Sequence, residues 1–364
     1  MKVYGYTQVN GVFAKPTGVA KHIDQMFHGL ARTPGVDFSM VMGNDQQLEQ
    51  SPLHDLPAIR LPYARKKMEI CWSLFGRPRI DKFCRDADWI YTPFESAVTS
   101  KQAQVASTLH SLYYFDKSLP GYETRRHPRI RFRFLLRSMV RNRQLILTVS
   151  EFLKRQVIEW FGADPSRVIV VGNGAEPEFF EAGRQPYMPQ DRPYVVAVSG
   201  LNFLDGAQYV IPVARALLKK DPNLLIKVAG HQHEQEFLDQ AKVLPNIQLL
   251  GYQQSKQLAA LMHDSVALLF LNRYETFGMG VVEAMAAGTP VIGTNFTAVP
   301  EIVANAGMIV EPEKPEEVTD QILTLARTPS ARASLIEAGA RRALDFTWES
   351  CLHRLLAALR NPPA

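Results

Sequence analysis

The sequence predicts an α/β fold made of two doubly wound, Rossmann-like domains. Its 364 residues, 46% hydrophobic and 21% charged, suffice for two domains of about 100–200 residues each. Between residues 194 and 293, short apolar segments alternate with helical patterns. Apolar strands separated by helices indicate a parallel sheet that is covered on both faces. The first half carries similar strands, and a cluster of prolines and polar residues at 176–194 marks the join.

The first domain is expected over residues 1–180. A short buried strand is predicted at "KVYGYT" (2–7), and a helix is predicted after Thr17, a suitable N-cap. The helix follows from apolar residues that recur at helical spacing, namely Val19, Ile23, Met26, Phe27 and Leu30. Further strands are predicted at 88–93, 104–110, 144–150 and 167–174.

The second domain is expected over residues 181–345, where the alternation is regular. Strands are predicted at 194–200, 224–230, 246–251, 266–271 and 289–293. Helices are predicted at 206–219, 234–242 and 255–263, and another opens near Gly278. The segment 346–364 holds an amphipathic helix (348–360) that can pack on either domain, including a return to the first.

The composition excludes several classes of protein. No apolar run approaches the ~18 residues of a membrane-spanning helix, and the polar start lacks a secretion signal, so we expect a cytoplasmic protein. Cys71, Cys84 and Cys351 have neither metal-ligand nor redox spacing. The histidines at 231 and 233 lack a third ligand, so no metal is expected.

Two glutamates, Glu275 and Glu283, flank a glycine-bearing turn after the strand at 266–271. Ligands of open parallel sheets bind at the carboxyl ends of strands. The next helix begins there with unpaired backbone N–H groups that suit phosphate, and Gly278 and Gly280 let a ligand approach the backbone. A carboxylate beside a phosphate is repelled by it unless the carboxylate accepts hydrogen bonds from neutral donors, such as the two hydroxyls of a ribose. The pair of glutamates therefore points to a nucleotide sugar. The alternative is that Glu275 is a cap and Glu283 a solvated helix residue.

The segment "ETFGMGVVEAMAAGTPVI", with "VPEIV" at 299–303, resembles the donor-binding signature of the retaining glycosyltransferases of family 4, which have the GT-B fold. Weaker family features occur in the family's order along nearly the whole chain, most of them before this motif. They are "TGVAKHI" (17–23), "TLH" (108–110), "TVSEFLK" (148–154), "VIVVGNGAEPEFF" (168–180), "IQLLGY" (247–252) and "DFTWE" (345–349).

The resemblance implies two domains facing a cleft, a nucleotide-diphosphate sugar linked to UDP or GDP, and a saccharide or lipid-linked acceptor. It implies catalytic roles for His110, which reaches the sugar, and for Glu275, which orients the donor, with Glu283 on the ribose. A backbone-satisfied His110 at a strand end is the alternative. The expected donor contacts are Thr17, Gly18, Asn202, Arg273, Phe277, Gly278, Met279, Gly280 and Glu283. No metal and no cofactor besides the donor are implied.

The sequence departs from the family at "SGLNFLDG" (199–206), where the family has an arginine and a lysine that neutralise the leaving diphosphate. Gly200 and Asp205 stand at those two positions. Losing one preorganised donor of this kind costs about 3–4 kcal/mol of transition-state stabilisation. The candidate substitutes are Arg273, Lys21 and Lys15, or a neutral hydrogen bond from Asn202.

Two functions therefore compete. The first is a retaining glycosyltransferase of surface polysaccharide or glycolipid assembly. The second is a non-catalytic relative that binds a partner, lipid or glycan. The segment from Arg125 to Arg143 mixes eight arginines with apolar residues, which suits an anionic membrane surface, although a core helix with a solvated basic face is the alternative. No base-reading module is present, so nucleic acid is not an expected partner.

Overall fold

The computed structural model describes residues 1–8, 17–49, 51–142, 144–188, 190–230 and 232–363. The chain divides into two compact units, which are residues 1–173 with 348–364, and residues 174–347. The expected boundary at residues 180 and 181 lies inside helix α5 (Pro177–Gly183), which belongs to the second unit. The physical reason is close packing, since a Cβ on Gly183 would lie 2.2 Å from the carbonyl oxygen of Ala286.

The first unit contains a seven-stranded sheet of order β3-β2-β1-β4-β5-β6-β7 in which all pairs are parallel. Its strands are β1 (Lys2–Tyr6), β2 (Asp37–Met42), β3 (Ala58–Arg60), β4 (Trp89–Thr92), β5 (Gln104–Leu109), β6 (Leu145–Thr148) and β7 (Val168–Val170). Its helices are α1 (Gly18–Arg32), α2 (Arg65–Phe75), α3 (Arg126–Arg141), α4 (Glu151–Phe161) and α13 (Trp348–Arg360). The sequence pattern did not predict β2, β3 or α2.

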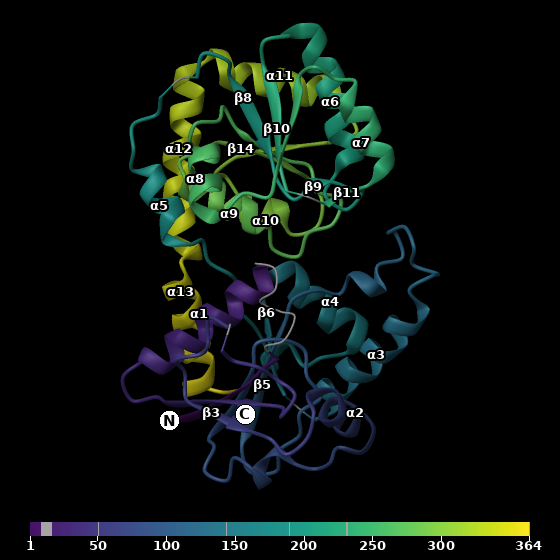
Figure 1. Cartoon of the computed structure of the whole chain (residues 1–364), viewed down its shortest axis with the longest axis vertical. Helices are drawn as coiled ribbons and strands as arrows, with labels where there is room; N and C mark the ends of the chain where they lie inside the picture. Colours follow the sequence, from purple (N-terminus) through teal and green to yellow (C-terminus); the bar gives the residue numbers. More distant parts are fainter. Residues whose placement is uncertain (9–16, 50, 143, 189, 231, 364) are drawn as a thin grey trace. The chain divides into compact units, whose positions relative to one another are not determined.

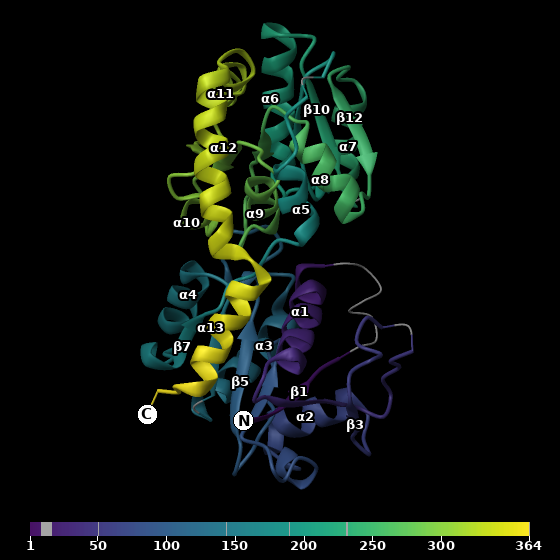
Figure 2. The ribbon, with the colours of Figure 1, turned by 90° about the vertical axis from the view of Figure 1, so that its left-hand side faces the viewer.

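Strand β1 shows how period-two alternation places helices on both faces of this sheet. Tyr4 and Tyr6 join a core that includes Trp72 of α2, whereas a Cβ on Gly5 would lie 2.6 Å from Cζ of Phe27 in α1. Thr17 is the N-cap of α1, as predicted, and its hydroxyl oxygen accepts the Ala20 N–H at 3.2 Å. Helix α13 lies along α1 (Figure 2).

The second unit contains a six-stranded parallel sheet of order β12-β10-β8-β13-β14-β15. These strands are β8 (Tyr194–Ala197), β10 (Leu225–Ala229), β12 (Ile247–Gly251), β13 (Leu268–Phe270), β14 (Val291–Thr294) and β15 (Met308–Val310). A short separate pair joins β9 (Gly200–Leu201) to β11 (Gln232–His233). The strands that the sequence predicted between residues 194 and 293 are all present.

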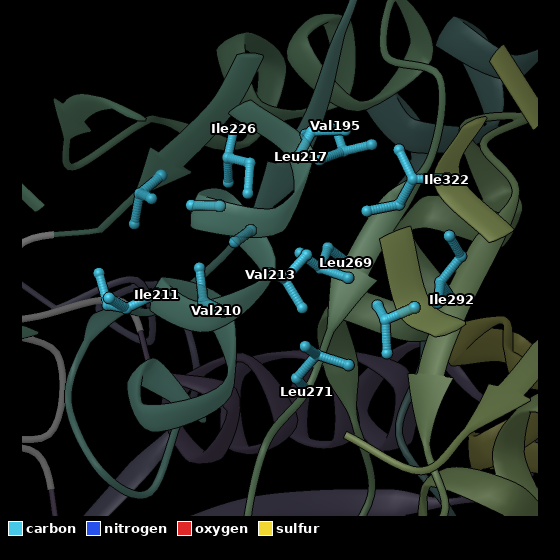
Figure 3. Packing of buried hydrophobic residues seen from close by; sticks show 14 of the residues in the cluster. Val195, Val210, Ile211, Val213, Leu217, Ile226, Leu269, Leu271, Ile292 and Ile322 are labelled. Atoms are coloured by element: carbon cyan, nitrogen blue, oxygen red, sulfur yellow. The ribbon is translucent and has the colours of Figure 1, made fainter. Parts of the chain in front are cut away.

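Helices cover both faces of this second sheet (Figure 1). Besides α5, they are α6 (Ala207–Lys220), α7 (Gln235–Lys242), α8 (Ser255–His263), α9 (Met279–Ala286), α10 (Val299–Val303), α11 (Pro315–Arg327) and α12 (Pro329–Ala343). On one face, α6 and α11 pack with the strands into a core whose branched side chains interdigitate, as Figure 3 shows for Val213, Leu269 and Ile322. The predicted Rossmann-like fold of both units is confirmed.

Short 3-10 helices occur at Ile80–Lys82, Tyr113–Phe115, Pro165–Arg167 and Leu344–Phe346. Among the described residues, no helix combines the length and the apolar character that crossing a bilayer requires.

Candidate functional site

The candidate donor site lies where the strand order of the second sheet reverses. Strand β8 pairs with β10 on one side and with β13 on the other, so the chain enters the sheet at β8 and later returns beside it. Loops at the carboxyl ends of such strands diverge and leave room for a ligand. The loop after β13 carries Glu275, and the loop after β8 carries Asn202 and Asp205.

Glu275 is held by backbone and side-chain donors. Its Oε1 accepts the N–H of Thr276 at 3.0 Å and of Phe277 at 3.3 Å, and its Oε2 lies 3.4 Å from Nδ2 of Asn272. Its own N–H donates to Oγ1 of Thr297 at 3.0 Å. Burial raises the pKa of Glu275 above its usual value, although these donors lower it. The carboxylate is therefore oriented rather than free, which suits positioning a sugar.

Helix α9 begins directly after this carboxylate. Gly278 is its N-cap with φ at +95°, a left-handed conformation that favours glycine. The N–H groups of Val281 and Val282 bond to the carbonyl of Gly278. Within the described part of the chain, no hydrogen bond uses the N–H groups of Met279 and Gly280. With the helix dipole, these two groups can receive a phosphate oxygen.

Gly280 has a role that differs from the expected one. The sequence suggested that its missing side chain lets a ligand approach, but a Cβ there would lie 2.9 Å from Cγ2 of Val198 and 3.2 Å from Cε2 of Phe270. Protein side chains already fill that space. Gly280 therefore lets α9 close on β8 and β13, and any ligand contact is through its N–H.

Glu283 lies in α9 and is only 6% exposed, so it is not the solvated helix residue of the alternative interpretation. Burying a carboxylate costs free energy unless hydrogen bonds or opposite charges compensate it, so this position requires polar partners. Phe277 is also buried, and its ring packs edge-on against Phe346 with centroids 5.6 Å apart. Phe277 thus anchors the turn from within.

The loop after β8 is clamped against the loop after β13. Gly206 has φ at +83°, and a Cβ there would lie 2.0 Å from the carbonyl oxygen of Leu271. The N–H of Arg273 donates to the carbonyl of Leu204 at 2.8 Å. Gly200, at the family's arginine position, is buried in the β9–β11 pair with φ at +104°, which an arginine would adopt only with strain.

Asp205, at the family's lysine position, forms a polar cluster with two asparagines. Its Oδ2 accepts a hydrogen bond from Nδ2 of Asn202, its N–H donates to Oδ1 of Asn202 at 3.1 Å, and its Oδ1 lies 3.5 Å from Nδ2 of Asn272. Burial raises the pKa of Asp205 to about 6; the Asn202 bond opposes the rise and the charge of Glu275 adds to it. The side chain of Asn202 is therefore hydrogen-bonded to Asp205. The family's lysine position carries a negative charge here whenever Asp205 is ionised.

Three basic residues were candidates to replace the family's missing arginine and lysine. The guanidinium of Arg273 lies over the ring of Phe296, 4.7 Å from its centroid, next to the loop that carries Glu275. Lys21 lies in the first turn of α1 in the first unit, close in sequence to Thr17 and Gly18. Lys15 lies outside the described residues, as does His231.

His110 follows β5 at the carboxyl edge of the first sheet. Its Nε2 lies 2.8 Å from the carbonyl oxygen of Pro93, so that nitrogen carries the proton and Nδ1 remains an acceptor. Its backbone N–H donates to Oε1 of Glu95 at 2.8 Å. Burial lowers the pKa of His110, although the Glu95 charge and the Pro93 bond raise it. A neutral His110 can accept a hydroxyl hydrogen bond but carries no charge.

A second histidine, His22 of α1, packs edge-on against His110 with ring centroids 4.9 Å apart. Its Nδ1 donates to Oδ1 of Asn173 at 2.8 Å, and its Nε2 accepts from the hydroxyl of Tyr91 at 3.0 Å. That hydroxyl lies 3.1 Å from Oγ1 of Thr108. Burial lowers the pKa of His22 to about 3. Sequence reasoning missed this network, although His22 falls on the buried face of the predicted helix.

No three His, Cys, Asp or Glu side chains lie together as metal ligands in the described ranges.

Two family models match the chain. The model for glycosyltransferase family 4 matches residues 16–179, and that for glycosyl transferases group 1 matches residues 179–342. O-antigen chain mannosyltransferase B of Escherichia coli is 24% identical over 289 residues, which cover 75% of this chain and 74% of that protein. Glycogen synthase of Mycobacterium tuberculosis is 27% identical over 223 residues, 58% of this chain and 53% of that one.

Solved structures support the same fold. Sucrose-phosphate synthase of Thermosynechococcus elongatus aligns with a TM-score of 0.74 and 20% identity, covering 99% of this chain and 98% of that one. The Anabaena protein HepE, solved in complex with UDP-glucose, aligns with a TM-score of 0.70 and 17% identity over 99% of both chains. Together with two Rossmann-like units and family matches from residue 16 to 342, these likenesses place the chain in glycosyltransferase family 4, with the GT-B fold.

Proposed function

We propose that this chain is a retaining glycosyltransferase that moves a sugar from a nucleotide-diphosphate sugar to a saccharide or lipid-linked acceptor. The observation that carries the proposal is the turn at Glu275, where an oriented carboxylate adjoins two backbone N–H groups that no described residue uses. Two similar proteins fit this proposal. One is named O-antigen chain mannosyltransferase B, and the other, HepE, was solved in complex with UDP-glucose. Surface polysaccharide or glycolipid assembly on the cytoplasmic side is the setting we infer.

The chemistry needs orientation and charge stabilisation more than a strong acid, because a nucleotide diphosphate leaves readily. In the retaining step, the acceptor oxygen forms a bond to the anomeric carbon on the face from which the diphosphate departs. The bond from that carbon to the diphosphate oxygen breaks, and the diphosphate takes the acceptor proton. Glu275 would orient the donor sugar, and Nδ1 of neutral His110 would accept a hydrogen bond from a hydroxyl. Glu283 would bind the ribose.

The proposal is tested by slow hydrolysis of UDP- and GDP-sugars without an acceptor, with the anomer formed first identified by NMR. Retention of configuration is expected. Glu275→Gln should lower the rate about 100-fold or more, since the neutral amide loses the charge that the site holds in place. Glu178→Gln, on the exposed face of α5, is the matched control and should match the wild type. Inversion, or equal rates for both variants, would contradict the proposal.

The second candidate, a non-catalytic binding protein, is favoured by one observation. Neither Gly200 nor Asp205 supplies positive charge for a leaving diphosphate, and Asp205 adds negative charge whenever it is ionised. This candidate predicts no turnover with any nucleotide sugar, so the hydrolysis assay separates the two functions.

We also propose that the Arg125–Arg143 segment contacts an anionic membrane. In its helix α3, Ile130 and Phe134 are 45% and 60% exposed, while Leu136 and Met139 are buried. Several of its arginines are exposed as well, namely Arg126, Arg131, Arg133, Arg137 and Arg141; Arg143 lies outside the described residues. Apolar side chains among exposed cations suit a lipid headgroup layer.

Flotation with phosphatidylglycerol vesicles tests this contact. The double variant Ile130→Ser with Phe134→Ser should lose binding, whereas Val243→Ser should keep it because Val243 is 76% exposed but lies in the second unit. Absence of wild-type binding to anionic vesicles would refute the contact.

A further inference from the structure

The first unit has two adjoining hollows at the edge of its sheet opposite to His110. They measure about 890 and 940 Å³ and share Phe75, Arg77 and Arg79. The larger hollow also includes Lys101 and Gln102, which precede β5, whereas His110 follows it. A six-residue strand is about 20 Å long, so this hollow lies well away from His110 within the first unit.

The larger hollow, called the basic hollow below, is lined by five cations and one acid. All five cations are exposed, and none forms an ion pair with a described residue. They are Arg77, Arg79, Lys82, Arg85 and Lys101. The acid is Asp81. Five like charges around one hollow repel one another, and a multiply charged anion would relieve that repulsion.

Asp81 does not neutralise these cations, because its carboxylate holds the wall of the hollow together. It accepts the Ser100 hydroxyl at 2.5 Å, the Lys101 N–H at 2.6 Å and the Gln102 N–H at 3.3 Å. Although burial opposes the change, these bonds hold the pKa of Asp81 below its usual value. The acid therefore stays ionised and fixes the backbone that carries Lys101.

The rest of the frame is tied down in the same way. The indole N–H of Trp72 donates to the carbonyl of Pro78 at 2.5 Å. The hydroxyl of Thr99 donates to the carbonyl of Gly76 at 2.9 Å, and the N–H of Ile80 donates to the carbonyl of Thr99 at 3.0 Å. The cations thus project from a fixed backbone, which lowers the entropic cost of binding a ligand.

The negative end of a helix dipole does not account for so many cations. Helix α2 ends at Phe75 beside the basic hollow, and such an end carries about half a negative charge. One or two arginines would offset it. The remaining excess of positive charge, and the fork geometry of Arg77, Arg79 and Arg85, match phosphate oxygens.

We propose that the basic hollow is a binding site for a ligand that carries phosphate groups, separate from the donor site. The phosphate can belong to a soluble polyphosphate or to a phospholipid headgroup. Exposed Leu74 and Phe75, at 66% and 73%, adjoin the hollow and would suit acyl chains in the second case. The inference does not depend on sugar transfer.

The test uses the full chain and two probes. Tripolyphosphate binding is measured by calorimetry at low salt, and binding to phosphatidylcholine vesicles with and without phosphatidylglycerol is measured by flotation. The charge-reversal variant Arg79→Glu with Arg85→Glu should weaken binding of the effective probe about tenfold or more. The matched control is Arg155→Glu with Arg184→Glu, which makes the same charge change at exposed arginines outside the hollow.

Each outcome bears on the proposal. Tripolyphosphate binding that the Arg79/Arg85 variant loses, and that UDP-glucose does not displace, supports a soluble ligand. Binding only to vesicles with phosphatidylglycerol, lost in the same variant, supports a headgroup. If neither probe binds, or if both double variants weaken binding equally, the proposal is overturned. Thermal melts of both variants show whether they fold.

Discussion

Nδ2 of Asn272 lies 3.4 Å from Oε2 of Glu275, and the same amide lies 3.5 Å from Oδ1 of Asp205. One side chain thus joins the carboxylate that family resemblance assigns to the donor sugar and the carboxylate that stands at the family's lysine position. Because both carboxylates are half-buried and share this amide, the ionisation of Asp205 matters for stability and for the binding of a diphosphate.

Asp205→Asn should stabilise the protein near neutral pH. The folded-state pKa of Asp205 is raised from 3.8 to about 6, so the ionised form is disfavoured in the fold. Wild-type stability therefore loses a contribution as pH rises from about 4 through 6, and the loss is complete above that range. The variant should gain about 1–3 kcal/mol in urea unfolding at pH 7.5 and little near pH 4. An equal gain at both pH values would contradict this assignment.

The same residue should make UDP-glucose binding depend on pH. The two phosphates of UDP-glucose are diesters, so their charge is constant over this pH range. The terminal phosphate of UDP titrates near pH 6, so UDP itself would not isolate the effect of Asp205. Ionised Asp205 should repel the diphosphate, so wild-type affinity should fall by about threefold to tenfold as pH rises through 6. Asp205→Asn should remove that part of the dependence and leave the part due to Glu275. Parallel profiles for the two proteins would show that Asp205 lies away from the diphosphate.

Gly206→Ala should be among the more damaging glycine substitutions. The added Cβ would lie 2.0 Å from the carbonyl oxygen of Leu271 in a left-handed backbone conformation. We expect a loss of about 3 kcal/mol or more in unfolding free energy. Gly162→Ala is the control, because Gly162 also has positive φ but has nothing within 4 Å of the added Cβ; its loss should be about 1 kcal/mol. Equal losses would argue against the clamp between the two loops.

His22 should contribute to acid sensitivity. Burial lowers its folded-state pKa from 6.5 to about 3, so the unfolded chain takes up a proton first as pH falls. Below 6.5, wild-type stability should fall by about 1.4 kcal/mol per pH unit from this residue. His22→Gln removes the titration, so its deficit relative to wild type should shrink between pH 7 and pH 5. A constant deficit would mean that His22 protonates without cost in the fold.

The sequence was most informative where burial follows a simple period. Strands β8 and β13 are continuously apolar because helices cover both faces of the sheet, so their sequence pattern is easy to detect. In strand β3, by contrast, Ala58 and Arg60 are exposed and only Ile59 is partly buried, which leaves almost no pattern to detect. The expected boundary at residues 180 and 181 divides helix α5, because the contacts of this helix with α8 and α9 are made by tertiary packing that the local sequence does not reveal.

The site was predicted as residue types but not as contacts. The turn at Glu275 and Gly278 follows from local sequence, whereas the Asn272–Asp205 contact joins residues 67 positions apart. The His22–Asn173 bond spans 151 positions. Gly280 illustrates the converse, since local reasoning suggested ligand approach while Val198 and Phe270 fill the space. Only the folded chain distinguishes these roles.

The most direct test of the central claim is calorimetric titration with UDP, GDP and their sugar conjugates. The wild type, Glu283→Ala and the control Glu178→Ala are compared, with thermal melts to verify folding. We predict selective binding of one nucleotide that Glu283→Ala loses and Glu178→Ala retains. If no nucleotide binds to the wild type, or if Glu283→Ala binds it equally well, a working donor site in the second unit is contradicted.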